Sequence, residues 1–190
     1  MSKDYCPDIE SKYSLYTQLL EEQKTILDKI IEINKVGNNN TILEELRELK
    51  HITVRHYLCL ITNVSKKNQS SFKFKMRCVA LSGMPFFRYD SAGGTHRNYD
   101  GNYPLSGQQV PTPHFQKFTD KGICIAYQTD KLKNAKEAKA LEDINLSLAH
   151  FCDEAKITLN ESEYPEVKIT YDLGIPILET DPLKNIDFKQ

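Results

Sequence analysis

One short stretch, Phe72–Cys78, alternates strictly between apolar and basic residues, and this limits what the chain can fold into. Successive residues of a β-strand point to opposite sides, so the two kinds of side chain fall on opposite faces. The apolar face carries Phe72, Phe74, Met76 and Cys78, and the other face carries Lys73, Lys75 and Arg77. Such a strand belongs in a sheet with one buried face and one polar face.

Four further runs predict strands that pair with this one. They are short and rich in β-branched and aromatic residues, and turn-forming residues separate them. The runs are Ile52 to Val64, Phe86 to Tyr89, His114 to Phe118 and Ile123 to Gln128. Together they predict an antiparallel sheet of about five strands.

Three other segments have helical patterns. Apolar residues recur every three or four positions from Ile9 to Val36, and a capping box at Thr41 opens a short helix that ends near Lys50. A third apolar stripe runs from Ala135 to Ala155. The expected fold class is therefore α+β, with an N-terminal helical segment and a long helix packed on one face of the sheet.

The length of 190 residues predicts one domain with three parts. Residues 1–50 form the N-terminal helical segment, 51–157 the α+β core with the candidate site, and 158–190 a C-terminal wrap. The N-terminal stripe leaves two interpretations open, because it suits either a homodimer contact or packing against its own domain.

The composition excludes several protein classes. With 39% hydrophobic and 27% charged residues the chain falls in the globular range, and no apolar run approaches the roughly 18 residues that span a bilayer. The start, MSKDYCPDIESKYS, has no apolar signal core. Its five dispersed cysteines lack zinc-like spacing and indicate reduced, buried thiols, so we expect a cytoplasmic protein.

The stretch from Phe86 to Phe118 gathers ionisable groups, glycines and prolines between predicted strands. Imidazole titrates near neutrality and suits general acid–base catalysis, and arginine recognises phosphate with two parallel hydrogen bonds. We therefore expect His96 and His114 to act on a ribose 2′-hydroxyl and its phosphodiester, without metal or other cofactor. The expected catalytic residues are His96, His114, Arg88 and Asp90.

Two other interpretations of these residues stay open. Asp90, His96 and His114 also match the residue types of a two-histidine, one-carboxylate metal site, although their spacing is irregular. Alternatively, both imidazoles have structural roles and hydrogen-bond the loop.

The basic side of the Phe72–Cys78 strand predicts contacts with phosphates. Its cations stand about 7 Å apart, close to the spacing of phosphates along a nucleic acid. The net charge of −1 gives no overall attraction to nucleic acid, so binding needs a local patch. A solvated sheet face that discourages aggregation is the alternative. The expected RNA-binding residues are Lys66, Lys67, Lys73, Lys75, Arg77, Arg97 and Asn98.

The motif RYDSAGGTHRNYDG…VPTPHFQKF…IAY resembles the signature of a family carried by bacteriophages and other bacterial mobile elements. That pattern reads R-x-D, a glycine turn, H-x-N, D-G, P-x-P-H-x-H and A-Y. The resemblance covers roughly Ile52 to Tyr127 and departs at Gln116, where the pattern has a second histidine. The matching residues are Arg88, Asp90, His96, Asn98, Asp100, Gly101, Pro111, Pro113, His114, Ala126 and Tyr127.

The resemblance implies a mobile-element setting, where RNA-cleaving toxins and anti-CRISPR proteins are common. The leading interpretation is a small RNA-acting protein, a metal-independent endoribonuclease of defence or counter-defence whose partner is RNA, including CRISPR guide RNA. A non-catalytic inhibitor of a host protein such as a CRISPR effector, and a metal-dependent hydrolase, are the alternatives. Missing Walker-type, G-x-S-x-G and H-E-x-x-H motifs argue against P-loop nucleotidases, α/β-hydrolases and zincins.

Overall fold

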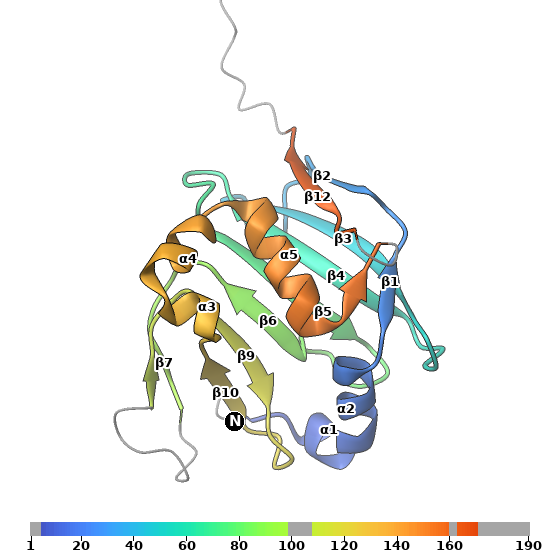
Figure 1. Cartoon of the computed structure of the whole chain (residues 1–190). Coiled ribbons are helices and arrows are strands. Elements are labelled where there is room, and N and C mark those ends of the chain that lie inside the picture. The colour runs from blue at the N-terminus through green and yellow to red at the C-terminus, as the bar shows by residue number, and fades with distance from the viewer. Residues whose placement is uncertain (1–4, 99–107, 160–162, 171–190) are drawn as a thin grey trace, which may run out of the picture.

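The computed structural model describes residues 5–98, 108–159 and 163–170, and most of them build one curled sheet (Figure 1). Its strands are β1 (Lys24–Ile26), β3 (Ile42–His51), β4 (Leu58–Ser65), β5 (Phe72–Cys78), β6 (Phe87–Asp90), β9 (His114–Phe118), β10 (Cys124–Tyr127) and β11 (Ile157–Thr158). They pair in the order β10-β9-β6-β5-β4-β3-β1-β11. All neighbours are antiparallel except β1 and β11, which are parallel.

Two small sheets and several helices complete the described part. Strand β2 (Ile30–Ile33) pairs in parallel with β12 (Glu166–Ile169), and β7 (His96–Arg97) forms a hairpin with β8 (Gln109–Val110). The helices are α1 (Pro7–Ser11), α2 (Tyr13–Glu21), α3 (Asp130–Lys133), α4 (Ala135–Ala140) and α5 (Ile144–Ala155). None of these helices has the length and apolar character needed to cross a membrane.

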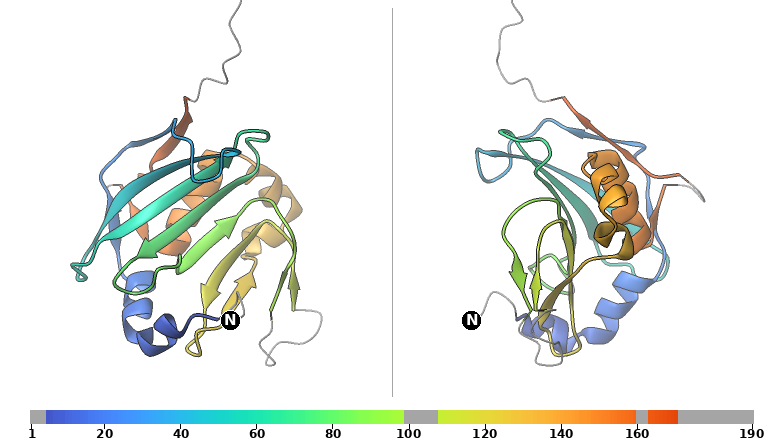
Figure 2. Two further views of the ribbon diagram at one scale, coloured as in Figure 1. Left: turned by 180° about the vertical axis from the view of Figure 1, so that it is seen from behind. Right: turned by 60° about the vertical axis from the view of Figure 1, so that its left-hand side comes forward.

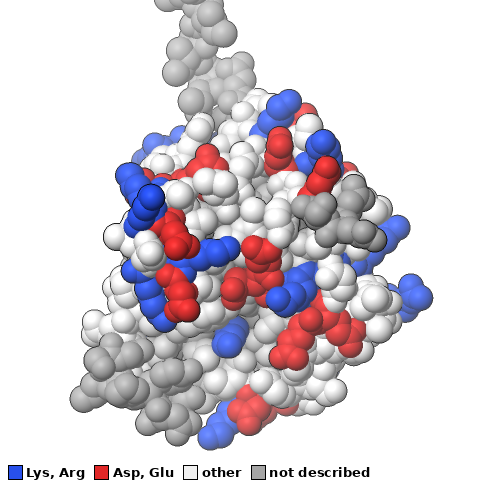
Figure 3. Space-filling model, in the orientation of Figure 1, with Lys and Arg blue, Asp and Glu red and all other residues white. Residues whose placement is uncertain are grey.

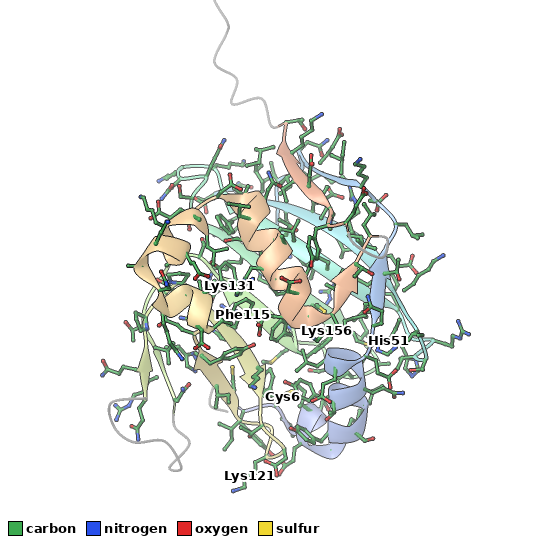
Figure 4. All side chains as sticks on the ribbon, in the orientation of Figure 1. Cys6, His51, Phe115, Lys121, Lys131 and Lys156 are labelled. Atoms are coloured by element: carbon green, nitrogen blue, oxygen red, sulfur yellow. The ribbon has the colours of Figure 1, made fainter. Side chains whose placement is uncertain are left out.

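Helix α5 lies in the hollow of the curled sheet, and its aromatic contacts form the centre of the core (Figures 1 and 2). The ring centroid of Phe151 lies 5.6 Å from that of Phe74, 5.4 Å from Phe87 and 6.3 Å from Phe115. Phe115 is labelled in Figure 4, between the sheet and the helices. All four rings are buried, and burial of each stabilises the fold by about 1.5–3 kcal/mol.

The α+β class predicted from the sequence is wrong. The chain is mostly β, with a mixed eight-stranded sheet curled into a half-barrel and short helices. We expected about five antiparallel strands, an N-terminal helical segment and one long helix. The five predicted strands are found as β4, β5, β6, β9 and β10, while β1 and β3 come from segments whose pattern predicts helix.

The predicted helix from Ile9 to Val36 ends early, with α2. Tyr16 and Leu19 are buried on its inward side, but Ile31 and Ile33 are buried from strand β2. Isoleucine is stiff at χ1 and favours strands, and the spacing of two between these residues places both on one face of a strand but not of a helix. Tyr16 and Leu19 pack into the core of the same chain, so they are not exposed for contact with a second copy. The homodimer stays a prediction.

The predicted short helix from Thr41 to Lys50 is wrong as well, because this segment forms strand β3. Its Leu, Glu and Arg residues favour helix locally, yet pairing with β4 along the strand overrides that preference. Leu43 and Leu49 are buried, and Glu45 lies between them in an ion pair with Arg47. Contacts distant in sequence therefore decide this element.

The predicted helix from Ala135 to Ala155 is interrupted. The carboxylate of Asp143 accepts hydrogen bonds from the backbone amides of Asn145 at 2.9 Å and Leu146 at 3.0 Å, so α5 begins with its own N-cap.

The C-terminal wrap expected from residue 158 onward is described only in part, and within it strand β12 pairs with β2. Residues 171–190 lie outside the described residues.

Two buried side chains from the sheet cap the carboxyl end of α2. The Lys24 ammonium donates to the carbonyls of Leu19 at 2.8 Å, Leu20 at 3.0 Å and Glu22 at 2.6 Å. The Nε2 of His51, beside α2 in Figure 4, lies 3.0 Å from the carbonyl of Gln18. The last carbonyls of a helix lack helical partners, so these contacts satisfy them, and the negative end of the helix dipole stabilises the ammonium although burial lowers the pKa of Lys24 to about 7.

We expect Lys24→Met to lower the free energy of unfolding by about 3 kcal/mol, because three buried carbonyls lose their donor. Chemical denaturation measures the loss. The control is Lys50→Met on the neighbouring strand, where the side chain is exposed and the expected change is below about 0.5 kcal/mol. Equal stabilities of the two variants would show that the cap contributes nothing.

Candidate functional site

Strands β5, β6 and β9 turn polar side chains to the outer face of the sheet, the face opposite α5. Phe74, Phe87 and Phe115 of these strands occupy the inner face, so the residues that alternate with them point to the outer face. Strand pairing sets Lys73 opposite Asp90, and Asp90 opposite His114. We call the set the outer-face cluster: Lys73, Lys75, Arg77, Arg88, Asp90, His114 and Gln116.

Asp90 is the carboxylate at the centre of the outer-face cluster, and its side chain is only 6% exposed. Its Oδ2 accepts a hydrogen bond from Arg88 Nη2 at 2.5 Å and another from Gln116 Nε2 at 3.2 Å. Lys73 Nζ lies 3.5 Å from Oδ1. A buried carboxylate is costly unless paired, so these donors hold both the charge and the geometry of the cluster.

Gln116 fixes the hydrogen bonding of His114. Its Nε2 lies 2.9 Å from His114 Nε2, and an amide nitrogen can only donate, so this imidazole nitrogen accepts. The Nδ1 of His114 lies 3.2 Å from the carbonyl of Pro111 and therefore carries the proton. Burial lowers the pKa of His114, although Asp90 at 3.8 Å opposes this. The ring is thus a neutral imidazole with both nitrogens engaged.

His96 approaches the same cluster from the β7–β8 hairpin, which lies on the side of the sheet away from α5 (Figure 2). The ring centroids of His96 and His114 are 6.1 Å apart. His96 is half-buried, and its Nε2 is buried without a hydrogen-bond partner among the described residues. The structure therefore brings together all four predicted catalytic residues: Arg88, Asp90, His96 and His114.

Asn98, predicted to bind RNA, is instead engaged with the edge of the sheet. It is buried, its Oδ1 accepts from the amide of Ala126 at 2.7 Å, and its Nδ2 donates to the carbonyl of Ala126 at 2.9 Å. The side chain thus takes the place of a neighbouring strand beside β10 and anchors the hairpin. Its neighbour Arg97 is exposed on β7. Lys66 and Lys67 follow β4 in the turn before β5.

The cations of the outer face crowd one another. Lys75 lies opposite Arg88 in the register, and its pKa is lowered by burial and by the charge of Arg88. By contrast, the face that carries the helices mixes cationic and acidic side chains (Figure 3). On the outer face, Asp90 and Glu44 of the nearby strand β3 offset part of the positive charge around Lys75.

A pocket of about 240 Å³ opens beside the cluster, between β6, β9, β10 and the β7–β8 hairpin. Its walls present apolar and polar surface in similar amounts, and the polar groups come from β6, β7 and β9. The lining residues are Met84, Pro85, Phe86, Phe87, Arg88, His96, Gln116, Phe118 and Cys124. Sequence reasoning did not identify Met84, Phe118 or Gln116 as site residues, because they become neighbours only when distant strands pair.

The structure does not support the alternative interpretation of Asp90, His96 and His114 as a metal site. Among the described residues, no three His, Cys, Asp or Glu side chains are placed to hold an ion together. His114 and Asp90 instead share the amide of Gln116. These side chains would have to exchange that amide for a metal before they could act as its ligands.

The stability of the protein is expected to fall as the pH drops through about 6.5. The folded chain binds a proton at His114 less readily than the unfolded chain, because the folded pKa lies below the model-peptide value of 6.5. The free energy of unfolding is therefore unaffected by His114 well above pH 6.5, and it falls as the pH drops from 6.5 to the pKa of His114 in the folded chain. Denaturation at a series of pH values should show a flatter slope for His114→Gln. An unchanged slope would contradict a buried, neutral His114.

No family model matches the chain, and neither a curated protein nor a solved structure matches it. The resemblance to the mobile-element pattern therefore stays a prediction, and its residues Asp100 and Gly101 lie outside the described residues. What remains is the geometry: a cation-rich sheet face, two imidazoles near one arginine, and a pocket beside them.

Proposed function

We propose that the protein binds RNA through the outer face of its sheet. The observation that carries this proposal is the row of Lys73, Lys75 and Arg77 on β5, with Arg88 beside it on β6. Like charges held this close repel one another, and a bound polyanion relieves that repulsion. The pKa of Lys75 is lowered mainly by burial, and the charge of Arg88 lowers it further.

The spacing of the row favours a nucleic-acid strand over a single small anion. Alternate residues of a strand lie about 7 Å apart, so successive cations can meet successive phosphates. Lys67 in the turn before β5 is exposed and would extend the row. The proposed setting is the cytoplasm of a bacterium that carries a mobile element, with CRISPR guide RNA as one candidate ligand.

Replacing Lys73, Lys75 and Arg77 together with alanine should weaken RNA binding at least tenfold at low salt and flatten its dependence on salt, because each lost phosphate contact removes released counterions. Fluorescence anisotropy with a labelled RNA at several salt concentrations measures both effects.

The matched control replaces three exposed lysines away from the outer-face cluster, Lys121, Lys133 and Lys136, and changes the net charge equally. Lys121 lies at the turn between β9 and β10 (Figure 4). If both triple variants bind alike, the outer face is only solvated. If the wild-type protein binds no RNA, the alternative function, a non-catalytic inhibitor of a host protein, is favoured.

Cleavage of RNA without metal is the second candidate function, favoured by the 6.1 Å between the two imidazoles beside Arg88. His96 Nε2 lacks a partner in the described chain and would accept the proton of a ribose 2′-hydroxyl as its oxygen attacks the phosphorus. Arg88 would stabilise the charge that develops on the phosphate. The leaving 5′-oxygen would take a proton from His114, once that ring is protonated and has released Gln116.

If this mechanism operates, His96→Ala and His114→Ala should each lower cleavage about 100-fold, the scale of a lost general base or acid. RNA affinity should change little, because the interaction is made mainly in the transition state. His56→Ala, at an exposed histidine, is the control for both readouts. Gel analysis of structured RNA measures cleavage. Intact RNA with the wild type, together with salt-dependent binding, would leave binding as the whole function.

A further inference from the structure

The pocket beside the outer-face cluster has the chemistry of a site for a planar, mostly uncharged group. Met84, Pro85 and Phe118 supply apolar surface, and Arg88 is the only charged residue among those that line it. The charge of Arg88 is already partly satisfied by Asp90 at 2.5 Å. A free phosphate would be a poor occupant, because the one cation of the lining is already partly neutralised and could not compensate its desolvation.

The polar groups of the pocket still have hydrogen-bonding capacity to offer. Gln116 uses its Nε2 for Asp90 and His114, which orients its Oε1 toward Cys124 Sγ at 3.7 Å, a weak contact for a good acceptor. His96 Nε2 and Arg88 Nε are buried nitrogens without a hydrogen-bond partner among the described residues. Buried polar atoms are normally paired, so a partner from outside the chain fits here after small side-chain shifts.

From this we infer that the pocket binds one unstacked nucleobase of the RNA strand whose phosphates lie on the outer face. The inference rests on the proposed function, because Arg88 both borders the basic row and lines the pocket. A strand whose phosphates lie along the row at Lys75 passes Arg88, its neighbour in the register, and so brings a base to the pocket mouth. The ligand class is single-stranded RNA, since a base inside a duplex cannot leave its stack without a cost.

The test compares a polyanion that carries bases with one that carries none. The first is a single-stranded RNA of about eight nucleotides, a length within the usual site size, 2′-O-methylated so that no 2′-hydroxyl can attack. It carries 2-aminopurine, whose emission rises when it unstacks from neighbouring bases. The second is inorganic polyphosphate, which carries phosphates without bases.

Met84 is 42% exposed at the pocket wall, so Met84→Ala removes apolar surface without disturbing the core. We expect this variant to bind the oligonucleotide about fivefold more weakly, to bind polyphosphate like the wild type, and to lose the rise in emission. Val79→Ala is the control, an exposed apolar residue outside the lining of the pocket, and should leave both ligands unaffected.

The outcomes separate the two proposals. If Met84→Ala matches the wild type on the oligonucleotide, or the emission of the wild type complex does not rise, the pocket holds no base and RNA binding by the outer face still stands. If the triple variant of Lys73, Lys75 and Arg77 loses neither ligand, the proposed function fails, whatever Met84→Ala does. If the wild type binds neither ligand, both proposals fail.

Discussion

The packing of Phe151 against three strands is the contact on which the rest of the structure depends. Because Phe74, Phe87 and Phe115 all turn inward to meet α5, the residues that alternate with them must turn outward. Register then places three neighbouring strands so that their outward residues form one continuous surface. The charge of the outer face is thus a consequence of the core, and a one-residue slip of any strand would bury its ions.

Asp90 makes this crowded surface possible. A row of cations on adjacent strands would repel, and a carboxylate that is only 6% exposed attracts Arg88 and Lys73 while it accepts from Gln116. The carboxylate in turn depends on these donors, since an unpaired buried charge would destabilise the fold by several kcal/mol. If the outer face binds RNA as we propose, stability and recognition are coupled at this residue, because the cations are ordered before the ligand arrives.

The sequence predicts an element correctly where the spacing of its apolar residues fits either a strand or a helix, but not both. Alternation in Phe72–Cys78 fits a strand and no helix, and this strand is confirmed as β5. Ile30 to Ile33 fits both periods, and the Leu-Glu-Arg composition of β3 favours helix until β4 pairs with it. In the site, Arg88, Asp90 and the two histidines could be predicted because they lie close together in a stretch rich in ionisable residues. Met84 and Gln116 could not, because nothing in the sequence marks them and they line the pocket only once the strands have paired.

Gln116 shows how one residue decides which chemistry the outer-face cluster supports. Where the mobile-element pattern has a second histidine, this chain has an amide whose nitrogen can only donate. The amide therefore holds His114 as an acceptor and Asp90 as an ion in one fixed network. An imidazole at this position would donate or accept according to its protonation and would make proton exchange between the rings easier. With glutamine there, the network favours the proposed RNA binding over the proposed cleavage, because His114 would have to break its contact with Gln116 before it could donate a proton.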